Sequence, residues 1–220
     1  WVGNLDDAGL LKDVKKIAGG KDESIFQPLW SPDGILHFVS DQTNWWNLYR
    51  YVDGKVQEVL PPIEAEFGQP LWVFNMSNYG FLEDGKIACF YTIKGIDHVG
   101  IIDPRSSTLE KLDIPFTSIS SFKVSKDSLM FFGASPTKVQ TLISYHVPKK
   151  SLKEIKSSKK VDLDREDISV PQTIEFPTED GKTAYGFYYP PKNKNFEGID
   201  LPPLIVKSHG GPTARTHGVL

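Results

Sequence analysis

Short apolar runs, each closed by a turn signal, dominate roughly the first 157 residues of the chain. Turn signals such as Asp33-Gly34, Asp53-Gly54 and Lys126-Asp127-Ser128 interrupt the runs about every 8 to 12 residues, which is the spacing of strands in an all-β fold. The clearest unit predicts four antiparallel strands, at residues 25–30, 35–39, 46–51 and 55–60.

The same four-strand unit recurs twice more. The second unit predicts strands at residues 71–74, 86–93, 98–103 and 109–112, and the third at 119–124, 129–133, 141–147 and 152–155. A period of about 45 to 50 residues with four strands in each repeat is typical of β-propeller blades. Residues 1–18 then supply the outer strands of a further blade. We therefore expect residues 1–160 to form a partial β-propeller of about three and a half blades.

The pattern changes after residue 160. A strand at 172–176, a turn at 179–181 and a returning strand at 184–189 precede a continuous apolar run at 204–208. Such a run is typical of an interior strand of a parallel sheet. An apolar strand followed by His-Gly-Gly is typical of the oxyanion-hole region of an α/β-hydrolase, so residues 161–220 are expected to hold the first three strands of such a domain. The predicted fold class is mostly β, the C-terminal part of a β-propeller with four-stranded blades followed by the start of that domain. Neither part shows an amphipathic helix pattern.

The segment His209-Gly210-Gly211-Pro212-Thr213 directly follows the last of these predicted strands. Glycines let backbone N–H groups approach a developing oxyanion, and one such donor is worth about 3 to 4 kcal/mol in catalysis. Gly210 and Gly211 are therefore the candidate oxyanion-hole residues, with the alternative that Gly-Gly-Pro only turns the chain. In α/β-hydrolases the nucleophile, acid and base follow this loop. We accordingly expect all three beyond Leu220 and no catalytic residue of the triad within this chain.

Three further polar residues lie in or near this loop in the sequence. His209 precedes the expected nucleophile, whereas the base of the fold follows it, so we assign His209 to support of the loop. Ser208 lacks the flanking glycines of a nucleophile elbow and is interpreted as a strand-end hydroxyl. His217 receives no assignment.

Glu64 and Glu66 lie in the predicted connection between two blades and are candidates for a substrate cavity. A substrate ammonium group buried without a partner costs several kcal/mol, so a site that binds a free N-terminus needs such a carboxylate. Solvated loop carboxylates are the alternative interpretation. The aromatic residues of the same region are expected to fill layers between blades rather than to bind a peptide, namely Trp30, Trp45, Trp46, Tyr49 and Trp72.

The amino-acid composition and net charge argue against several classes of binding partner. The chain has 220 residues, 39% of them hydrophobic and 24% charged, and a formal net charge of -3. Without a basic surface signal, nucleic acid and membranes are not expected partners, and no apolar stretch reaches the length of a membrane span. The single cysteine, Cys89, lies in an apolar run and is expected to be buried, which fits a reducing compartment and a cytoplasmic location. No cluster has metal-ligand spacing, so neither a metal nor a cofactor is expected.

Five segments together carry a family resemblance: WSPDG (30–34), FVSDQTNWWNLYRY (38–51), EAEFGQPLWVF (64–74), TAYGFYYPP (183–191) and PPLIVKSHGGPT (202–213). In this order and spacing the chain resembles the prolyl oligopeptidase family of serine peptidases, most closely its acylaminoacyl-peptidase and dipeptidyl-aminopeptidase-like branch. The resemblance implies a propeller of about seven blades that caps an α/β-hydrolase domain, with the substrate cavity between them. It also implies hydrolysis of short peptides through an acyl-enzyme intermediate. Some members use a Tyr side chain near the oxyanion loop, where this chain has His209.

Two other functions stay open. A propeller with a vestigial hydrolase segment would be a non-catalytic interaction scaffold, and a carboxylesterase would share the His-Gly-Gly loop but lack a propeller before it. The expected partner is a short peptide substrate, and the oligomeric state stays open, a homo-oligomer included. The chain taken alone is expected to be inactive.

Overall fold

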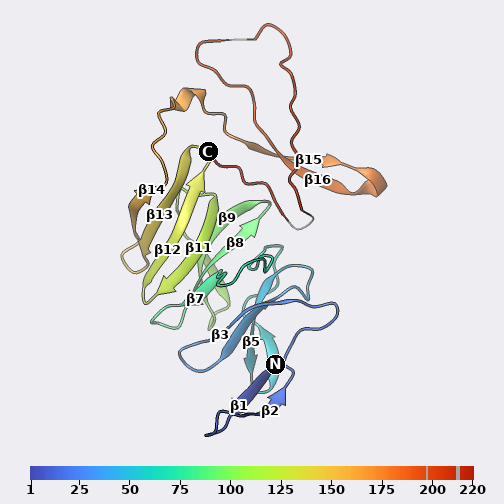
Figure 1. Cartoon of the computed structure of the whole chain (residues 1–220), viewed down its shortest axis with the longest axis vertical. Coiled ribbons are helices and arrows are strands. Elements are labelled where there is room, and N and C mark those ends of the chain that lie inside the picture. The colour runs from blue at the N-terminus through green and yellow to red at the C-terminus, as the bar shows by residue number, and fades with distance from the viewer. Residues whose placement is uncertain (197, 212–213) are drawn as a thin grey trace.

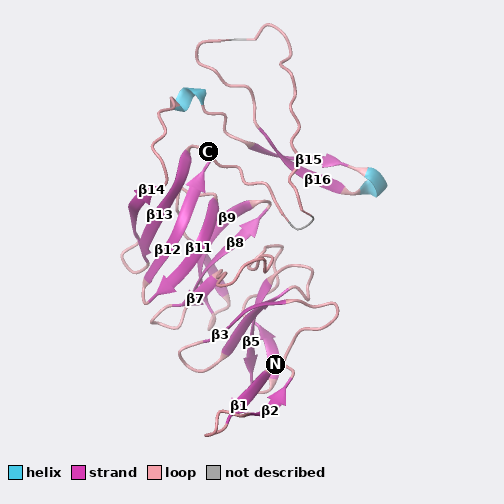
Figure 2. Ribbon diagram, in the orientation of Figure 1, coloured by secondary structure: helices cyan, strands magenta, loops and turns pink. Residues whose placement is uncertain are grey.

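The computed structural model describes residues 1–196, 198–211 and 214–220. It contains three four-stranded and two two-stranded antiparallel sheets (Figures 1 and 2). Within these ranges there is no α-helix, and the helical structure consists of the 3-10 turns η1 (Arg165–Asp167) and η2 (Glu179–Gly181). Accordingly, no described helix is long and apolar enough to cross a membrane. The all-β pattern predicted from the sequence is confirmed.

The first four-stranded sheet follows the clearest predicted unit. Strands β3 (Ile25–Trp30), β4 (Leu36–Ser40), β5 (Asn47–Val52) and β6 (Lys55–Glu58) pair in chain order, each antiparallel to the next. Both residues of the Asp53-Gly54 turn between β5 and β6 have positive φ, as a two-residue hairpin turn requires. The turn signal in the sequence therefore marks a real hairpin.

The other two four-stranded sheets repeat this meander. The second contains β7 (Tyr79–Phe81), β8 (Ile87–Ile93), β9 (Ile96–Asp103) and β10 (Thr108–Lys111), and the third contains β11 (Ser118–Ser125), β12 (Ser128–Ser135), β13 (Lys138–His146) and β14 (Ser151–Ser157). We call the three sheets blades one to three in chain order. Every predicted strand of the third unit corresponds to an observed strand.

The predicted strand at residues 71–74 is wrong. These residues form a loop with exposed side chains, and the first strand of blade two is β7 instead. The reason lies in the neighbouring blade, where the side chain of Gln27 on β3 accepts a hydrogen bond from the Asn78 N–H at 2.7 Å, directly before β7 begins. Apolar composition alone does not show which run of residues finds a strand partner.

Two hairpins accompany the blades. β1 (Val2–Leu5) pairs with β2 (Leu11–Lys15), as predicted for that end of the chain. β15 (Gln172–Pro177) pairs with β16 (Thr183–Tyr188), which confirms the two strands predicted around the 179–181 turn.

The apolar run at 204–208 is not a strand, contrary to the prediction. It has no regular structure, and Leu204, Ile205 and Val206 are 77%, 89% and 80% exposed. An interior strand needs a hydrogen-bonded neighbour on each side, and in the described part of the chain neither β15 nor β16 pairs with this run. The interpretation of Ser208 as a strand-end hydroxyl fails for the same reason.

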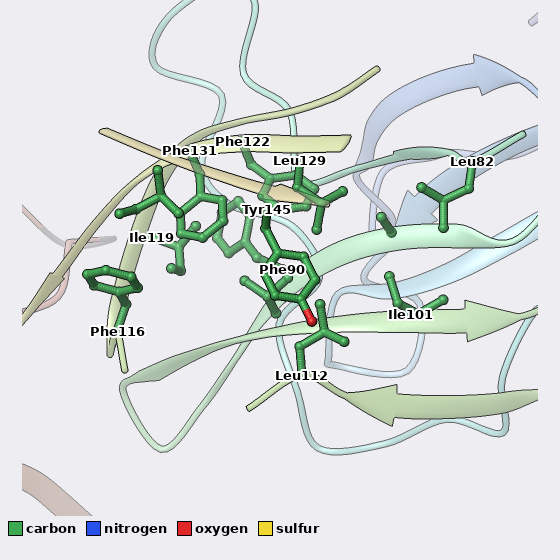
Figure 3. Packing of buried hydrophobic residues seen from close by; sticks show 13 residues of the cluster. Leu82, Phe90, Ile101, Leu112, Phe116, Ile119, Phe122, Leu129, Phe131 and Tyr145 are labelled. Carbon is green, nitrogen blue, oxygen red and sulfur yellow. The ribbon is translucent and has the colours of Figure 1, made fainter. Parts of the chain in front are cut away.

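The hydrophobic core lies between the blades, because the central strands bury both of their faces. On β8, Ala88 and Phe90 belong to the cluster shared with blade three. The alternate residues Ile87, Cys89 and Tyr91 belong to the cluster shared with blade one. Cys89 is fully buried, as predicted, and burial raises the pKa of its thiol. Figure 3 shows the cluster between blades two and three, which includes Leu82, Phe90, Ile101, Phe122, Leu129 and Phe131.

Candidate functional site

Turns and connections from all three blades meet on one side of the molecule, which we call the loop face. It comprises the β4–β5, β8–β9 and β12–β13 turns and the connections that lead into β7 and β11. Backbone hydrogen bonds join these pieces, since the Phe67 N–H donates to Trp46 O at 2.7 Å and the Asp97 N–H donates to Thr117 O at 3.0 Å. Neighbouring blades therefore present one continuous surface.

Glu66 is the half-buried carboxylate of the loop face. Its backbone exchanges two hydrogen bonds with Thr92, at 2.9 and 3.0 Å, and its Oε2 accepts the Trp46 N–H at 3.0 Å. Burial raises the pKa of the Glu66 carboxyl. Among the described residues this N–H is the only donor to the Glu66 carboxylate, which retains acceptor capacity for a further partner.

Glu64, the second acidic candidate of the connection, is exposed. The pKa of Lys94, in the β8–β9 turn, is raised mainly by its hydrogen bond to Glu175 and to a smaller extent by the charge of Glu64. Lys94 Nζ lies 2.9 Å from Glu175 Oε1 on β15. The two predicted acidic residues therefore share one connection but differ in environment, with Glu66 half-buried and Glu64 in solvent.

Gly68 fixes the path of the connection beside Glu66. A Cβ atom on Gly68 would lie 2.8 Å from the Trp46 ring, closer than real Cβ contacts allow. Trp46 in turn packs edge-on against Phe26, with the ring centroids 6.2 Å apart. Side-chain packing thus sets the position of the backbone that carries the Glu66 carboxylate.

Asp97, which the sequence did not single out, is a fully buried carboxylate at the same face. Its Oδ1 accepts from the Thr92 hydroxyl at 2.6 Å and from Arg215 Nη2 at 2.7 Å. Its Oδ2 accepts the Ile119 N–H at 2.8 Å, and Arg215 Nη1 donates to Gly95 O at 3.0 Å. The carboxylate is therefore paired with a charge and hydrogen-bonded at both oxygens, which offsets the cost of its burial.

Residues 214–220 lie against the blades without regular structure (Figure 1), and we call them the docking segment. His217 Nδ1 lies 3.1 Å from Ser118 Oγ, and the Leu220 N–H donates to Ser135 O at 3.1 Å. His217 is exposed as a residue, but partial desolvation of its ring against blade three lowers its pKa, and the nearby Arg215 guanidinium lowers it further. His217, left without a role by the sequence, is thus a contact between the docking segment and blade three.

The Gly210-Gly211 pair lies in an exposed loop just before the docking segment. Chain neighbours aside, no described heavy atom lies within 4 Å of the position that a Cβ would take on Gly210, and Gly211 has a φ of 70°, which suits glycine. His209 Nδ1 lies 3.3 Å from Gly210 O, a contact within the loop itself. Pro212 and Thr213, the end of the same motif, lie outside the described residues.

The predicted packing of aromatic residues between blades is confirmed for some residues and wrong for others. Tyr49 is buried, and Trp46 packs against the core between blades one and two. Trp30 and Trp72 are instead 58% and 64% exposed. Trp30 lies on β3, an edge strand of its sheet, and Trp72 lies in the 71–74 loop, so neither is enclosed between two sheets.

The pair formed by Asp97 and Arg215 was not predicted from the sequence. An aspartate inside an apolar strand pattern, as in Ile96-Asp97-His98-Val99, is a signal of a buried charge. Its partner lies 118 residues away, however, and no local pattern identifies a contact at that separation.

No protein-family model matches the chain, and no curated protein matches it either. Puromycin hydrolase is similar, with a TM-score of 0.88 and 31% sequence identity over 99% of the chain. A puromycin-hydrolyzing peptidase of Mycobacterium tuberculosis is similar over 99% of the chain as well, with a TM-score of 0.90 and 26% identity. The chain is related to the peptidases of the prolyl oligopeptidase family.

Prolyl oligopeptidase B from Galerina marginata shares the fold alone, with a TM-score of 0.64 and 13% identity over 85% of the chain. The antiparallel blades correspond to the propeller of these prolyl oligopeptidase-family neighbours. The chain spans about a third of its solved relatives, 33% of puromycin hydrolase and 34% of the Mycobacterium tuberculosis peptidase.

Proposed function

We propose that this chain is the propeller-containing part of a serine peptidase that hydrolyses short peptides or aminoacyl amides through an acyl-enzyme intermediate, as acylaminoacyl- and dipeptidyl-peptidase-like enzymes do. The observation that carries the proposal is the 31% identity to puromycin hydrolase over 99% of the chain. In this proposal residues 1–160 belong to the propeller and residues 161–220 begin the α/β-hydrolase domain. The nucleophile, acid and base follow Leu220 in chain order, and the chain alone is inactive.

In the proposed enzyme, Gly210 and Gly211 supply backbone N–H groups to the oxyanion of the tetrahedral intermediate. The exposed, side-chain-free surroundings of Gly210 and the positive φ of Gly211 support this role, because an oxyanion must approach the backbone closely. His209 supports the loop rather than acting as the base, since its ring contacts the Gly210 carbonyl.

Glu66 is the proposed recognition group for a substrate ammonium, with Glu64 adding negative charge at the rim. Glu66 is half-buried, fixed by its bond from the Trp46 N–H and able to accept a further donor. Its raised pKa means that the site disfavours an isolated negative charge, so a bound cation gains from pairing with it. Two solved relatives are named for hydrolysing puromycin. Puromycin carries a free α-amino group beside its amide bond and is therefore the first substrate to test.

The test uses the full-length protein that contains this chain. We expect it to hydrolyse puromycin or a dipeptidyl amide faster than simple esters. A protein that turns over esters alone would instead be a carboxylesterase, and one that turns over none of these compounds would be a scaffold. Acetyl-alanyl anilide added to the same panel separates acylaminoacyl specificity from recognition of a free amine, because it lacks the ammonium that Glu66 is proposed to bind.

A further inference from the structure

The pair Asp97 and Arg215 connects blade two with the docking segment, close in sequence to the His209–Gly211 loop. Asp97 is fully buried, and its other partners, Thr92 and Ile119, come from β8 and β11. Hydrogen bonds from two blades hold the Asp97 carboxylate in one position. A side chain that pairs with this carboxylate is therefore held in a defined position as well.

Arg215 donates two hydrogen bonds at this position. Nη2 donates to Asp97 Oδ1 at 2.7 Å and Nη1 donates to Gly95 O at 3.0 Å. Because the guanidinium is planar, two bonds from different nitrogens define its orientation as well as its position. A lysine in its place has a single nitrogen and cannot span the two acceptors with the same geometry.

Among the described residues, the glycine loop has few other neighbours. Gly210 and Gly211 have no described heavy atom closer than 4 Å to their Cβ positions, and residues 204–208 before them are unpaired and exposed. Arg215 follows Gly211 by four residues, which at full extension span at most about 14 Å. Fixing Arg215 therefore limits where the Gly210-Gly211 N–H groups can lie relative to the propeller.

We propose that Arg215, held by Asp97 and Gly95 of the propeller, is a positioning residue that sets the place of the Gly210-Gly211 oxyanion loop. This inference rests on the proposed function. It assigns the propeller a part in the acyl-transfer step, since the donors to the oxyanion depend on a carboxylate of blade two for their placement. Misplacement of catalytic groups by about 1 Å costs roughly 100-fold in rate, so loss of the pair is expected to be visible in kcat.

The experiment compares the full-length wild type with Arg215→Met, Arg215→Lys and Lys94→Met. Lys94→Met is the matched control because it removes an exposed ion pair, to Glu175, at the same face. For Arg215→Met we expect kcat on puromycin to fall roughly 10- to 100-fold with KM nearly unchanged. The affinity for a peptidyl boronic acid, which mimics the tetrahedral intermediate, should fall by a similar factor. Arg215→Lys should recover part of both losses, and Lys94→Met should behave as wild type.

Amide hydrogen exchange in the docking segment, followed at Leu220, whose N–H donates to Ser135 O, provides a readout that does not depend on activity. Exchange in this segment should be faster in Arg215→Met than in wild type or Lys94→Met. If Arg215→Met does not fold, the double variant Asp97→Asn/Arg215→Met, which buries no unpaired charge, takes its place. Unchanged exchange or unchanged kcat and boronic-acid affinity in the folded variant would overturn the inference. A wild type without hydrolysis or serine labelling overturns the proposed function instead, and the exchange measurement still decides whether Arg215 holds the segment.

Discussion

Gln27 and Tyr79 exchange hydrogen bonds across the boundary between blades one and two. The Tyr79 hydroxyl donates to Gln27 O at 2.8 Å, and Gln27 Nε2 donates to Tyr79 O at 2.8 Å. The same side chain accepts the Asn78 N–H through Oε1 at 2.7 Å. One glutamine on an edge strand thus satisfies the polar groups of the neighbouring blade where β7 begins.

Gln27→Ala should therefore lower the free energy of unfolding by more than the loss of one exposed amide side chain would. The substitution leaves the Asn78 N–H without its partner in a residue that is 1% exposed, which costs about 1 to 3 kcal/mol in the free energy of unfolding. Urea denaturation followed by tryptophan fluorescence measures the change. Gln57→Ala on the exposed strand β6 is the control and should stay within about 0.5 kcal/mol of wild type. Equal stabilities of the two variants would contradict the role assigned to Gln27.

Glu66→Gln should weaken substrate binding without lowering the stability of the fold. The glutamine oxygen still accepts the Trp46 N–H, and removal of a half-buried carboxyl whose pKa is raised removes a desolvation cost. The free energy of unfolding at pH 7 should consequently be unchanged or higher. The KM of the full-length protein for puromycin should rise on the order of 10-fold, because the proposed ammonium partner is lost.

The control for Glu66→Gln is Glu83→Gln in the exposed β7–β8 turn, at the opposite end of β8 from the loop face. An unchanged KM in Glu66→Gln would remove this residue from substrate recognition. A marked loss of stability would show that the carboxylate has a structural role instead.

Two histidines that resist protonation predict that stability falls in mildly acidic solution. Burial lowers the pKa of His37, which is buried, and of His98, which is half-buried, below the usual 6.5. The unfolded chain then binds protons that the folded state resists, so this contribution is complete above about pH 6.5 and is lost as the pH falls further. Glu66 acts in the opposite direction, because protonation of its carboxyl stabilises the folded state as the pH falls through its raised pKa, and this gain is complete near pH 4.5.

Urea denaturation at pH 7.5 and pH 5.5 measures this dependence. We expect lower stability at pH 5.5 and a smaller difference in His37→Phe, where an aromatic ring still packs against Phe81 but cannot take up a proton. Stability that is equal or higher at pH 5.5 in the wild type would show that these histidines do not cause a loss of stability in acid.

Gly68→Ala should disturb the connection that carries Glu66. The new Cβ would lie 2.8 Å from the Trp46 ring, and overpacking of this kind costs about 1 to 3 kcal/mol. Gly186→Ala on β16 is the control, since its Cβ would meet Ile174 at an ordinary 3.6 Å. Thermal unfolding of both variants provides the comparison, and a tolerated Gly68→Ala would mean that Trp46 moves freely.

The sequence predicted the strands because alternation and turn residues are local signals. The Asp53-Gly54 hairpin and the two-sided burial of β8 follow directly from them. The runs 71–74 and 204–208 were predicted wrongly because hydrophobicity shows that a segment needs a partner but not which partner is present.

The candidate site, too, could be predicted only in part from the sequence. Glu64 and Glu66 could be placed in a connection between blades from strand counting alone. The burial of Glu66 could not, because it depends on how Gly68 and Trp46 pack. The Arg215 contact to Asp97 depends on the folded path of 118 residues and has no local sequence signal.

We propose, above all, that this chain belongs to a serine peptidase whose nucleophile follows Leu220. The most direct measurement is fluorophosphonate labelling of the full-length protein and of the 220-residue chain, with the labelled peptide identified by mass spectrometry. We predict labelling of one serine beyond Leu220 in the full-length protein, competition by puromycin, and no labelling of the chain alone. Labelling within residues 1–220, or none in either protein, would contradict the account.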